Sequence, residues 1–483
     1  MDIRWILKPR CLISIIGLGD QAVKEAAERI QAAIDESGYV FPKKRVIISL
    51  APSDKKKSGS HFDLAMAIGV LQQNGDIGAK NIEDYGFIGE LSLNGQLRAC
   101  RGILPMIIAG QKKGIHKIIV PEQNLREAML VQGVEILGFS CLRDVIAYLE
   151  GKISKRTECS KDNTDSGILG YTLDFSEVKG QEDLIEAVVL AAAGGHNMLM
   201  IGEPGCGKTM IAQRIPTILP EMTEEECLEV TKIYSISGML PNGQALIKFR
   251  PFRAPHHNAS LNALIGGGVN AMPGEVSLAH NGVLFLDELA EFSRRTLDAL
   301  RQPVEDKKVC ISRVNGTHTF PSNFMFVTAM NPCPCGYYPG TKCRCTDYEV
   351  LKYRGKISGP IMDRIDIQKE VHPVNFFEIT GETTGYSSEL LRKKVEIARK
   401  IQQERYSDQA GVNCNAQMTT ALIQKYCELD QESLKLLRKT SEEYGYSARV
   451  IHKLLRLART SADIDKEEKI RLQDIRKVLD CRD

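Results

Sequence analysis

The chain of 483 residues is long enough for roughly two to four domains, each with its own hydrophobic core. Its hydrophobic content of 43% and charged content of 26% are ordinary for a soluble globular protein. The formal net charge of +2 excludes a global attraction to nucleic acid, so any polyanion-binding surface must be local.

Three features of the sequence indicate the cellular compartment in which the protein is expected. The longest apolar run, residues 184–201, is interrupted by Glu186, Gly194, Gly195 and His196, which argues against a membrane span. The opening residues, MDIRWILKPR, lack the apolar stretch and cleavage site of a signal peptide. Fourteen cysteines without an export signal are typical of reduced thiols. We therefore expect a cytoplasmic protein without a membrane partner.

Residues 1–150 alternate between strand-like and helix-like patterns, which predicts a first α/β domain. VIISLA (46–51) and IIVP (118–121) are typical of short buried strands, and residues 21–38 have helical spacing that ends at Gly38. The polar stretch that follows, GKISKRTECSKDNTDSG, predicts a linker over residues 151–170.

A second α/β region, residues 171–372, opens with a phosphate-binding pattern. MLMIGEPGCGKTMIAQRI (198–215) reads as a strand, the sequence G-x-x-x-x-G-K-T, and a helix. Glycines let backbone N–H groups surround phosphate oxygens at a helix N-terminus, while the lysine reaches the β/γ-phosphates and the threonine can ligate Mg²⁺. The alternative, a plain glycine turn, does not explain the lysine and threonine. The predicted ATP-binding residues are Gly202, Glu203, Pro204, Gly205, Cys206, Gly207, Lys208 and Thr209.

Residues 248–275 show little periodicity but contain Arg250, Arg253, His256 and His257, which could contact a polyanion. Adjacent histidines on a loop rarely converge on one metal ion, and no third ligand is evident nearby. We therefore interpret this segment as an inserted loop and not as a metal site.

Two carboxylates follow the next buried strand, in NGVLFLDELAEF (281–292). Asp287 is expected to hold Mg²⁺, and Glu288 to polarise the attacking water. Acidic residues at strand ends are also common helix caps, but their place after a phosphate loop favours nucleotide hydrolysis.

The segment VEDKKVCISRVNGTHTFPS (304–322) predicts a β-hairpin around Asn315-Gly316. Its cationic side chains suit contacts to a DNA backbone, although an ordinary surface hairpin remains the alternative. The predicted DNA-contact residues are Lys307, Lys308, Arg313 and His318. The strand after it, NFMFVTAMN (323–331), ends at the polar residue Asn331.

Two C-x-C pairs follow Asn331 directly, in the stretch AMNPCPCGYYPGTKCRCTD (329–347). Seven residues rich in Gly and Pro separate the pairs and could bring them together. Four thiolates would form a closed, structural Zn²⁺ site. A redox dithiol and four free thiols are the alternatives. The predicted zinc ligands are Cys333, Cys335, Cys343 and Cys345.

Beyond about residue 388 the chain is mostly helical. Four long stretches before that point carry a family resemblance: VKGQEDLIEAVVLAAAGGHNMLMIGEPGCGKT, RPFRAPHHNASLNALIGGG, PGEVSLAHNGVLFLDELAEF and YRGKISGPIMDRIDI. They resemble the YifB/ComM group of magnesium-chelatase-like AAA+ ATPases. The resemblance implies an α/β multidomain fold with a P-loop AAA+ core at 171–372 and a C-terminal helical lid at 373–483.

The resemblance also assigns roles to residues outside the phosphate loop. Asn331 matches the residue that orients the attacking water, and Arg364 matches the arginine finger offered to a neighbouring subunit. Arg449, in GYSARVIHKLLRLART, matches the second sensor of the lid. A fixed guanidinium stabilises charge on a transferring phosphate. The alternative for either arginine is a surface ion pair. In this group the hairpin faces a central pore, and the 248–275 loop is expected near the pore or the subunit interface.

The N-terminal stretches LAPSDKKKSGSHFDLAMAIGVL and GFIGELSLNGQLRACRGILPMIIAG resemble the Lon-protease-like (ribosomal S5 domain 2-like) domain that begins this family. Lon cleaves peptides with a Ser–Lys dyad, but His61 and Leu104 fall at the serine and lysine positions here. Ser58, Ser60 and residues 55–57 lie nearby in sequence without forming a dyad. We therefore expect no proteolysis. The first ten residues replace a strand that the family has before IIGLGD.

The resemblance implies a homo-hexameric ATPase that acts on single-stranded or branched DNA, as a branch-migration helicase in recombination or natural transformation. Its cofactors would be ATP and Mg²⁺. The first alternative is the ATPase motor subunit of a metal (magnesium) chelatase, against which the Lon-like domain and the C-x-C pairs argue. A second alternative is a non-enzymatic scaffold that uses ATP only to hold a ring.

Overall fold

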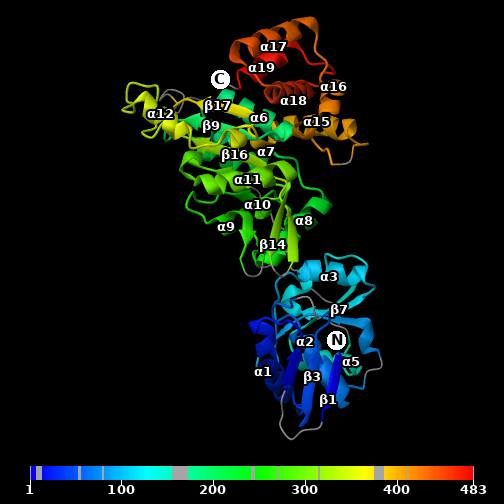
Figure 1. Ribbon diagram of the computed structural model, residues 1–483. Coiled ribbons are helices and arrows are strands. Elements are labelled where there is room, and N and C mark those ends of the chain that lie inside the picture. Colours follow the sequence, from blue (N-terminus) through cyan, green and yellow to red (C-terminus); the bar gives the residue numbers. More distant parts are fainter. Residues whose placement is uncertain are drawn as a thin grey trace. The chain divides into compact units, whose positions relative to one another are not determined.

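The architecture is that of a computed structural model of the chain (Figure 1). It describes residues 2–6 (backbone only), 13–52, 56–78, 81–154, 172–240, 245–268, 271–313, 316–374, 386–409 and 411–481. Most of the predicted linker, Lys55 and the hairpin residue Asn315 lie outside these ranges. Within them, no helix combines the length and apolarity that crossing a membrane requires.

The chain divides into two compact units, which we describe separately. The first comprises residues 1–166, 227–247 and 312–317. The second comprises residues 167–226, 248–311 and 318–483. The segment 227–247, which includes most of α8 (Glu224–Ser237), thus packs with the N-terminal region although it follows the phosphate loop in sequence.

The first unit is built on small sheets covered by helices. One sheet has the order β1-β3-β2, a second has the order β4-β7-β8, and β5 and β6 form a two-stranded ladder. The strands are β1 (Asp2–Ile6), β2 (Ile13–Ile16), β3 (Arg45–Ser49), β4 (Tyr85–Phe87), β5 (Glu90–Leu91), β6 (Leu97–Arg98), β7 (Lys117–Pro121) and β8 (Glu135–Phe139). The helices are α1 (Gln21–Glu36), α2 (Asp63–Asn74), α3 (Ile103–Lys112), α4 (Leu125–Ala128) and α5 (Leu142–Leu149).

Local sequence explains α1 and its place in this unit. Asp20 caps its N-terminus by accepting a hydrogen bond from the Val23 N–H. Val23, Ala26 and Ile30 recur on one face and are buried, as helical spacing requires. Arg29 donates to the buried Asp63 carboxylate of α2 at 2.8 Å, so the charge of that carboxylate is compensated.

The second unit contains a five-stranded parallel sheet with the order β10-β13-β16-β9-β17. Its strands are β10 (Phe252–Arg253), β13 (Val283–Leu286), β16 (Met325–Met330), β9 (Met198–Gly202) and β17 (Ile367–Val371). All residues of β13 and β16 are buried, which is typical of parallel strands covered on both faces. Because β9 lies between β16 and β17, its carboxyl end is beside those of both neighbours. That edge carries the candidate site.

Helices and short ladders surround this sheet (Figure 1). The helices are α6 (Glu182–Gly194), α7 (Lys208–Ile218), α9 (Leu261–Ile265), α10 (Glu275–Leu278), α11 (Arg294–Asp306), α12 (Asp347–Arg354) and α13 (Gly359–Met362). β11 (Gly266–Gly267) pairs with β12 (Met272–Pro273), and β14 (Lys308–Arg313) pairs with β15 (Gly316–Pro321).

The carboxyl-terminal part of the second unit is helical, as the sequence predicts. It comprises α15 (Ser388–Arg405), α16 (Thr420–Tyr426), α17 (Gln431–Tyr444), α18 (Ala448–Ile464) and α19 (Leu472–Leu479), drawn in orange and red in Figure 1. α15 and α18 both pack on α6. Residues of these helices share one hydrophobic core with the sheet.

The mixed α/β architecture confirms the coarse fold prediction. The apolar run 184–201 is a helix and a strand, and the predicted strands at 46–51 and 118–121 are β3 and β7. One prediction needs correction, because residues 304–306 belong to α11 and the hairpin begins only at Lys308. Residues 2–6 form a strand that pairs antiparallel with β3. The segment that stands in place of the family's first strand therefore contains a strand of its own.

Candidate functional site

The loop between β9 and α7 has the backbone that a phosphate cradle needs. Gly205 and Gly207 adopt φ values of +80° and +89°, which favour glycine. At Gly202, a Cβ atom would lie 2.4 Å from the Val371 carbonyl oxygen of β17, so no larger residue fits. The loop therefore keeps its N–H groups close to the strand ends, at the N-terminus of a helix.

Lys208 lies inside this loop and is buried. Its ammonium donates to the carbonyl oxygens of Gly202 at 2.7 Å and Glu203 at 2.9 Å, and to Asn331 Oδ1 at 3.4 Å. These are neutral partners, and an anion offered to the loop would be a stronger acceptor for the same ammonium. Asn331, at the end of β16, thus meets the phosphate lysine, and its predicted role in orienting the attacking water stays a prediction.

The two acidic residues after β13 reach the same edge. The Thr209 hydroxyl donates to Asp287 Oδ2 at 2.6 Å, and Asp287 Oδ1 accepts from the Glu288 N–H at 2.9 Å. A hydroxyl and a carboxylate this close are the hard oxygen ligands that Mg²⁺ prefers. This donor set therefore fits the magnesium ion that the sequence predicts.

Glu288 has a contact that sequence reasoning missed. One of its carboxylate oxygens lies 3.1 Å from Nδ1 of His257, which belongs to the loop after β10. Glu288 has φ of +51°, uncommon for a residue with a side chain, and its side chain is 53% exposed. The neighbouring His256 ring lies against that of His257, 4.1 Å between centroids. Of the two adjacent histidines, His257 contacts the carboxylate, while His256 Nδ1 accepts from the Asn258 N–H at 3.2 Å.

The two predicted arginines belong to different elements of the second unit, but Arg449 reaches Asp363, the residue directly before Arg364. Arg364, after α13, donates to the Pro360 carbonyl at 2.6 Å and pairs with Glu305, and its Nε atom is buried without a partner among the described residues. Arg449, in α18, lies 3.5 Å from Asp363 and its side chain is 79% exposed. Each guanidinium therefore has an ion-pair partner within its own chain, and the roles of both arginines stay predictions.

The four predicted zinc ligands converge. The sulfur atoms of Cys333, Cys335, Cys343 and Cys345 all lie within 4.8 Å of one another. The shortest separations are 3.3, 3.7 and 3.8 Å. Four sulfurs at about 2.3 Å from one tetrahedral zinc ion would be about 3.8 Å apart, so the cluster fits this metal. Backbone N–H groups of Arg344 and Tyr337 lower the pKa of the Cys335 thiol to about 6, which favours the thiolate form that metals bind. At Cys343 and Cys345 the backbone hydrogen bonds are outweighed by burial and the neighbouring sulfurs, which raise the pKa of both thiols.

Comparison with known proteins agrees with this site. Three family descriptions match the chain: "Subunit ChlI of Mg-chelatase" at residues 7–124, "Magnesium chelatase, subunit ChlI" at 174–379, and "Magnesium chelatase, subunit ChlI C-terminal" at 385–482. The competence protein ComM of Haemophilus influenzae is 41% identical over 95% of this chain and 89% of its own length.

The chain belongs to the magnesium-chelatase-like YifB/ComM family. The uncharacterized protein YifB of Escherichia coli is also 41% identical, over 97% of this chain and 91% of its own length. An uncharacterized protein of Mycobacterium tuberculosis is 36% identical over 94% of this chain and 89% of its own length. Membership of this family implies an AAA+ ATPase that uses ATP and Mg²⁺.

The hairpin of this YifB/ComM-family chain presents fewer free cations than the sequence suggested. Lys308, Arg313 and His318 are exposed. Lys307 instead ends α11 with φ of +55°, and its ammonium donates to the Phe324 carbonyl and lies over the Phe324 ring. Burial lowers the pKa of Lys307. Three of the four predicted DNA contacts thus remain available to a ligand, whereas the ammonium of Lys307 is engaged within the chain.

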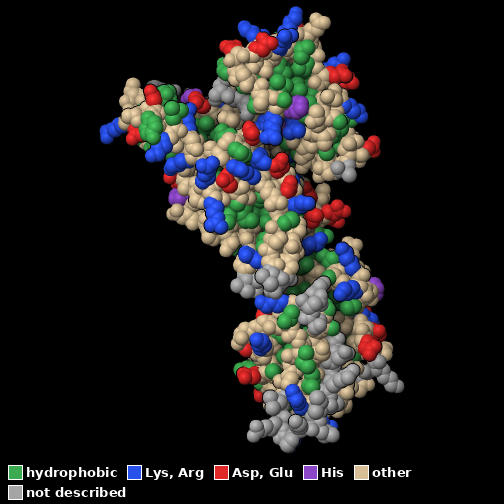
Figure 2. Space-filling view, viewed as in Figure 1, with side chains coloured by type: hydrophobic (Ala, Val, Ile, Leu, Met, Phe, Trp, Pro, Cys, Tyr) green, Lys and Arg blue, Asp and Glu red, His purple; other side chains and the backbone are tan. Residues whose placement is uncertain are grey.

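Basic residues outside the hairpin are mixed with acidic ones where they can be seen. On the face seen in Figure 2, lysine and arginine side chains are interspersed with acidic ones. Arg253 donates twice to Glu275, and Arg250 donates to the Asn281 carbonyl at 2.7 Å. These two arginines of the 248–275 loop therefore stabilise its fold.

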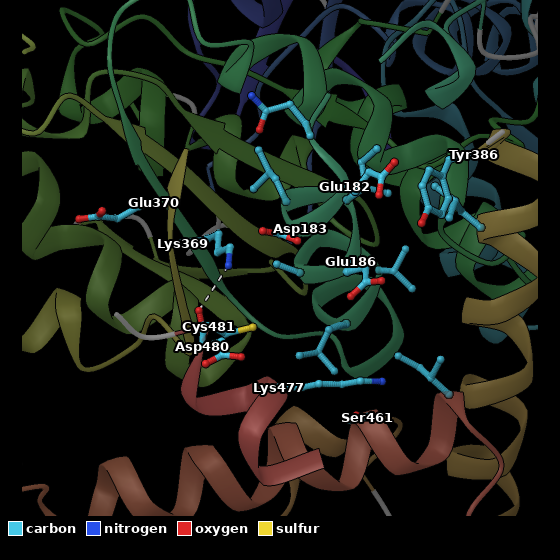
Figure 3. A pocket seen from close by; sticks show the side chains of 18 of the residues that line it. Glu182, Asp183, Glu186, Lys369, Glu370, Tyr386, Ser461, Lys477, Asp480 and Cys481 are labelled. Atoms are coloured by element: carbon cyan, nitrogen blue, oxygen red, sulfur yellow. Dashed lines mark hydrogen bonds between the residues drawn. The ribbon is translucent and has the colours of Figure 1, made fainter. Parts of the chain in front are cut away.

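A cavity of about 1070 Å³ lies beside α6, β17 and the end of α19 (Figure 3). Its charged lining is mixed, with Glu182, Asp183 and Glu186 from α6 and Lys369 from β17, and Asp183 is the nearest of the three acidic residues to Lys369 in Figure 3. Lys369 donates to the Asp480 carbonyl at 3.4 Å. The phosphate-loop residues 202–209 do not line it. The cavity is therefore distinct from the site that the motifs define.

In the first unit, the residues near the Lon dyad positions have structural partners. Leu104 is buried in α3, and the Ser60 hydroxyl donates to the Glu90 carboxylate. Burial lowers the pKa of His61, and the Lys57 ammonium donates to the Pro52 carbonyl.

Proposed function

We propose that this protein is an ATP-hydrolysing, homo-hexameric motor that acts on single-stranded or branched DNA. The observation that carries the proposal is the convergence of Lys208, Asn331 and the Thr209–Asp287 pair at one edge of the parallel sheet. Family membership supports the ATPase part. The similarity to a protein named for competence supports the link to DNA uptake and recombination.

The residues of the site have distinct tasks in this proposal. The N–H groups of residues 202–208 and the Lys208 ammonium bind the phosphates of ATP, and Thr209 with Asp287 would hold Mg²⁺. The ion, when bound, neutralises charge on the phosphate oxygens. Glu288 accepts a proton from the attacking water, and the Asn331 amide orients that water. His257 Nδ1 lies 3.1 Å from one oxygen of Glu288, and the proposal assigns the proton transfer to the other oxygen.

Hydrolysis is completed by arginines in the proposed assembly. Arg364 of one subunit reaches the nucleotide of its neighbour, and Arg449 senses the nucleotide from the helical lid. A guanidinium supplied by a second subunit makes hydrolysis depend on ring formation. The division into a Lon-like N-terminal domain at 1–150, a linker at 151–170, an AAA+ core at 171–372 and a lid at 373–483 is part of this proposal.

The Lon-like domain is assigned to DNA or partner binding and assembly, without protease activity. Two observations support this assignment: Leu104, at the lysine position, is buried, and the Ser60 hydroxyl donates a hydrogen bond to the Glu90 carboxylate. The four cysteines are assigned to one structural zinc ion. Metal analysis should find about one zinc per chain, and a preparation with iron in its place would contradict the zinc assignment.

The decisive experiment measures ATP hydrolysis by the full chain with Mg²⁺, alone and with single-stranded, duplex and Holliday-junction DNA. We expect hydrolysis that DNA stimulates, and unwinding or branch migration of the junction. Glu288→Gln should bind ATP but not hydrolyse it, and loss of DNA remodelling in this variant would exclude the scaffold alternative. Hydrolysis that no DNA affects, with no DNA binding, would contradict the motor proposal.

The second candidate is the motor subunit of a magnesium chelatase, favoured by the family descriptions that match three parts of the chain. It predicts porphyrin metallation when the other chelatase subunits are added. Metallation without any response to DNA would favour this candidate.

A further inference from the structure

We infer that the four-cysteine cluster is a metal-dependent brace for the phosphate loop, so that zinc occupancy sets the affinity for nucleotide. The inference rests on the proposed nucleotide and zinc sites and adds a physical connection between them. Three observations carry it: the closed geometry of the thiols, the weak packing of the segment that holds them, and a direct contact of that segment with the phosphate loop.

The segment has little besides the thiols to hold its shape. Cys333 is fully buried, but no residue from 337 to 346 is buried. A segment without apolar packing cannot offset the entropy of ordering its backbone. A metal ion bound by four thiolates supplies that free energy, as it does in other small metal-bound folds.

The same segment lies against the phosphate loop at Gly336. This residue has φ of +88°, and a Cβ atom added to it would lie 2.7 Å from both Cγ and Cδ of Pro204. Gly336 immediately follows the ligand Cys335. A Cβ atom on Gly340 would lie 3.9 Å from a carboxylate oxygen of Glu203. The segment that carries the cysteines thus packs against Pro204 of the phosphate loop at Gly336 and passes near Glu203 at Gly340.

Both ends of the segment are fixed to the site or to its surroundings. Asn331, two residues before Cys333, meets Lys208. Arg354 of α12 donates to the Pro332 carbonyl at 3.2 Å and lies over the Tyr338 ring. α12 begins directly after Cys345 with a capping box made by Thr346 and Glu349. The cysteines therefore lie in the middle of a segment whose two ends are already fixed. Zinc bound by the four thiolates would hold the middle of that segment against Pro204.

The test uses the full-length protein and measures two quantities: zinc per chain, and the Kd for a fluorescent ATP analogue with excess Mg²⁺. We expect Cys345→Ser to lose zinc and to raise the Kd at least about tenfold. Cys310→Ser is the matched control, because Cys310 is exposed on β14 and outside the cluster. It should keep both zinc and the wild-type Kd.

A second variant tests the contact without touching a ligand. Gly336→Ala should retain about one zinc per chain but weaken nucleotide binding about tenfold, because its Cβ displaces Pro204 and its backbone is strained. An unchanged Kd in a Cys345→Ser protein that has lost zinc would contradict the proposed brace. An unchanged Kd in a Gly336→Ala protein that retains zinc would contradict it as well. Either result would leave the proposed nucleotide site intact. If the wild-type protein binds no nucleotide, the proposed function itself fails.

Discussion

The imidazole of His257 and the carboxylate of Glu288 form a pair across the edge of the parallel sheet, with Nδ1 3.1 Å from Oε2. His257 comes from the loop after β10, and Glu288 from the end of β13, the neighbouring strand. One oxygen of the proposed catalytic base is thus occupied by a loop that begins beside it. The position of that loop therefore directly affects the carboxylate of the proposed base.

Removal of His257 should therefore change hydrolysis and spare nucleotide binding. We expect His257→Ala to raise kcat for ATP without DNA about threefold, because both carboxylate oxygens can then accept a proton from water. KM should stay within about twofold, since Lys208 and the loop amides are untouched. Steady-state ATPase measurements check both values. His257→Gln, which keeps a side-chain N–H donor, is the control and should behave like wild type. A fall in kcat would contradict the prediction.

The ATPase edge could be predicted from sequence because its chemistry is local. Gly202, Lys208 and Thr209 sit within one strand–loop–helix unit, and Asp287 follows a buried strand. Parallel strands bring their carboxyl ends to one edge, which is why Asn331 meets Lys208. The strands β3 and β7 and the helical end of the chain were likewise predictable, because each shows its own period and length.

Other features depend on how distant loops fold, and periodicity carries no information about that. The contact between Gly336 and Pro204 joins segments more than a hundred residues apart, and its only sequence trace is a glycine among other glycines. The sequence placed the two adjacent histidines on an inserted loop without a partner, whereas the pair of His257 with Glu288 appears only once the loop is placed. The hairpin boundary was wrong because Val304 and its neighbours complete the amphipathic face of α11.

Arg364 offers a test of the proposed action between subunits. Arg364→Ala should reduce kcat at least about 100-fold while nucleotide still binds, because the guanidinium that it removes stabilises only the transition state. Lys208→Ala should lose nucleotide binding. A mixture of the two inactive variants should regain hydrolysis, since an interface with the finger of one and the phosphate loop of the other is complete.

The control for this experiment is Arg438→Ala, which removes an exposed lid arginine paired with Glu442. It should leave hydrolysis unchanged. A mixture of Arg438→Ala with Lys208→Ala should show only the activity that the Arg438→Ala protein has by itself. Failure of the Arg364→Ala and Lys208→Ala mixture to regain activity, with both variants shown to assemble, would place the role of Arg364 within its own subunit.

His196 should make the stability of the second unit depend on pH. Its ring is fully buried, with Nε2 2.9 Å from the Thr460 hydroxyl. Burial lowers the pKa of His196; Arg399 and Arg456 act in the same direction, and Asp366 opposes them. Below the unfolded pKa of about 6.5 the unfolded chain binds the extra proton, so stability falls by about 1.4 kcal/mol per pH unit until the folded pKa is reached.

Denaturant unfolding of the full chain between pH 7.5 and 5.5 measures this slope. His196→Gln should have a lower free energy of unfolding at pH 7.5 but a shallower pH dependence below 6.5. His116→Gln, at an exposed position, should keep the wild-type slope. For Asp366, burial raises the pKa, but hydrogen bonds from His196 and the Asn197 N–H together with the charge of Lys453 lower it on balance, so Asp366 contributes only below about pH 4. An unchanged slope in His196→Gln would show that another group titrates.

The exposed cations of the hairpin should contribute to DNA affinity through phosphates and not through bases. The double variant Lys308→Ala, Arg313→Ala should bind every duplex sequence more weakly. It should also reduce the slope of log K against log salt by about 2, because each neutralised phosphate contributes about 0.9 to that slope. Fluorescence anisotropy at several salt concentrations measures both. Lys393→Ala, Arg438→Ala removes the same charge from exposed lid positions. If the two double variants weaken DNA binding equally, the hairpin contributes only through its net charge and not through its position.

Because the Lys307 ammonium already donates to the Phe324 carbonyl, substitution of Lys307 should lower the stability of the protein more than its affinity for DNA.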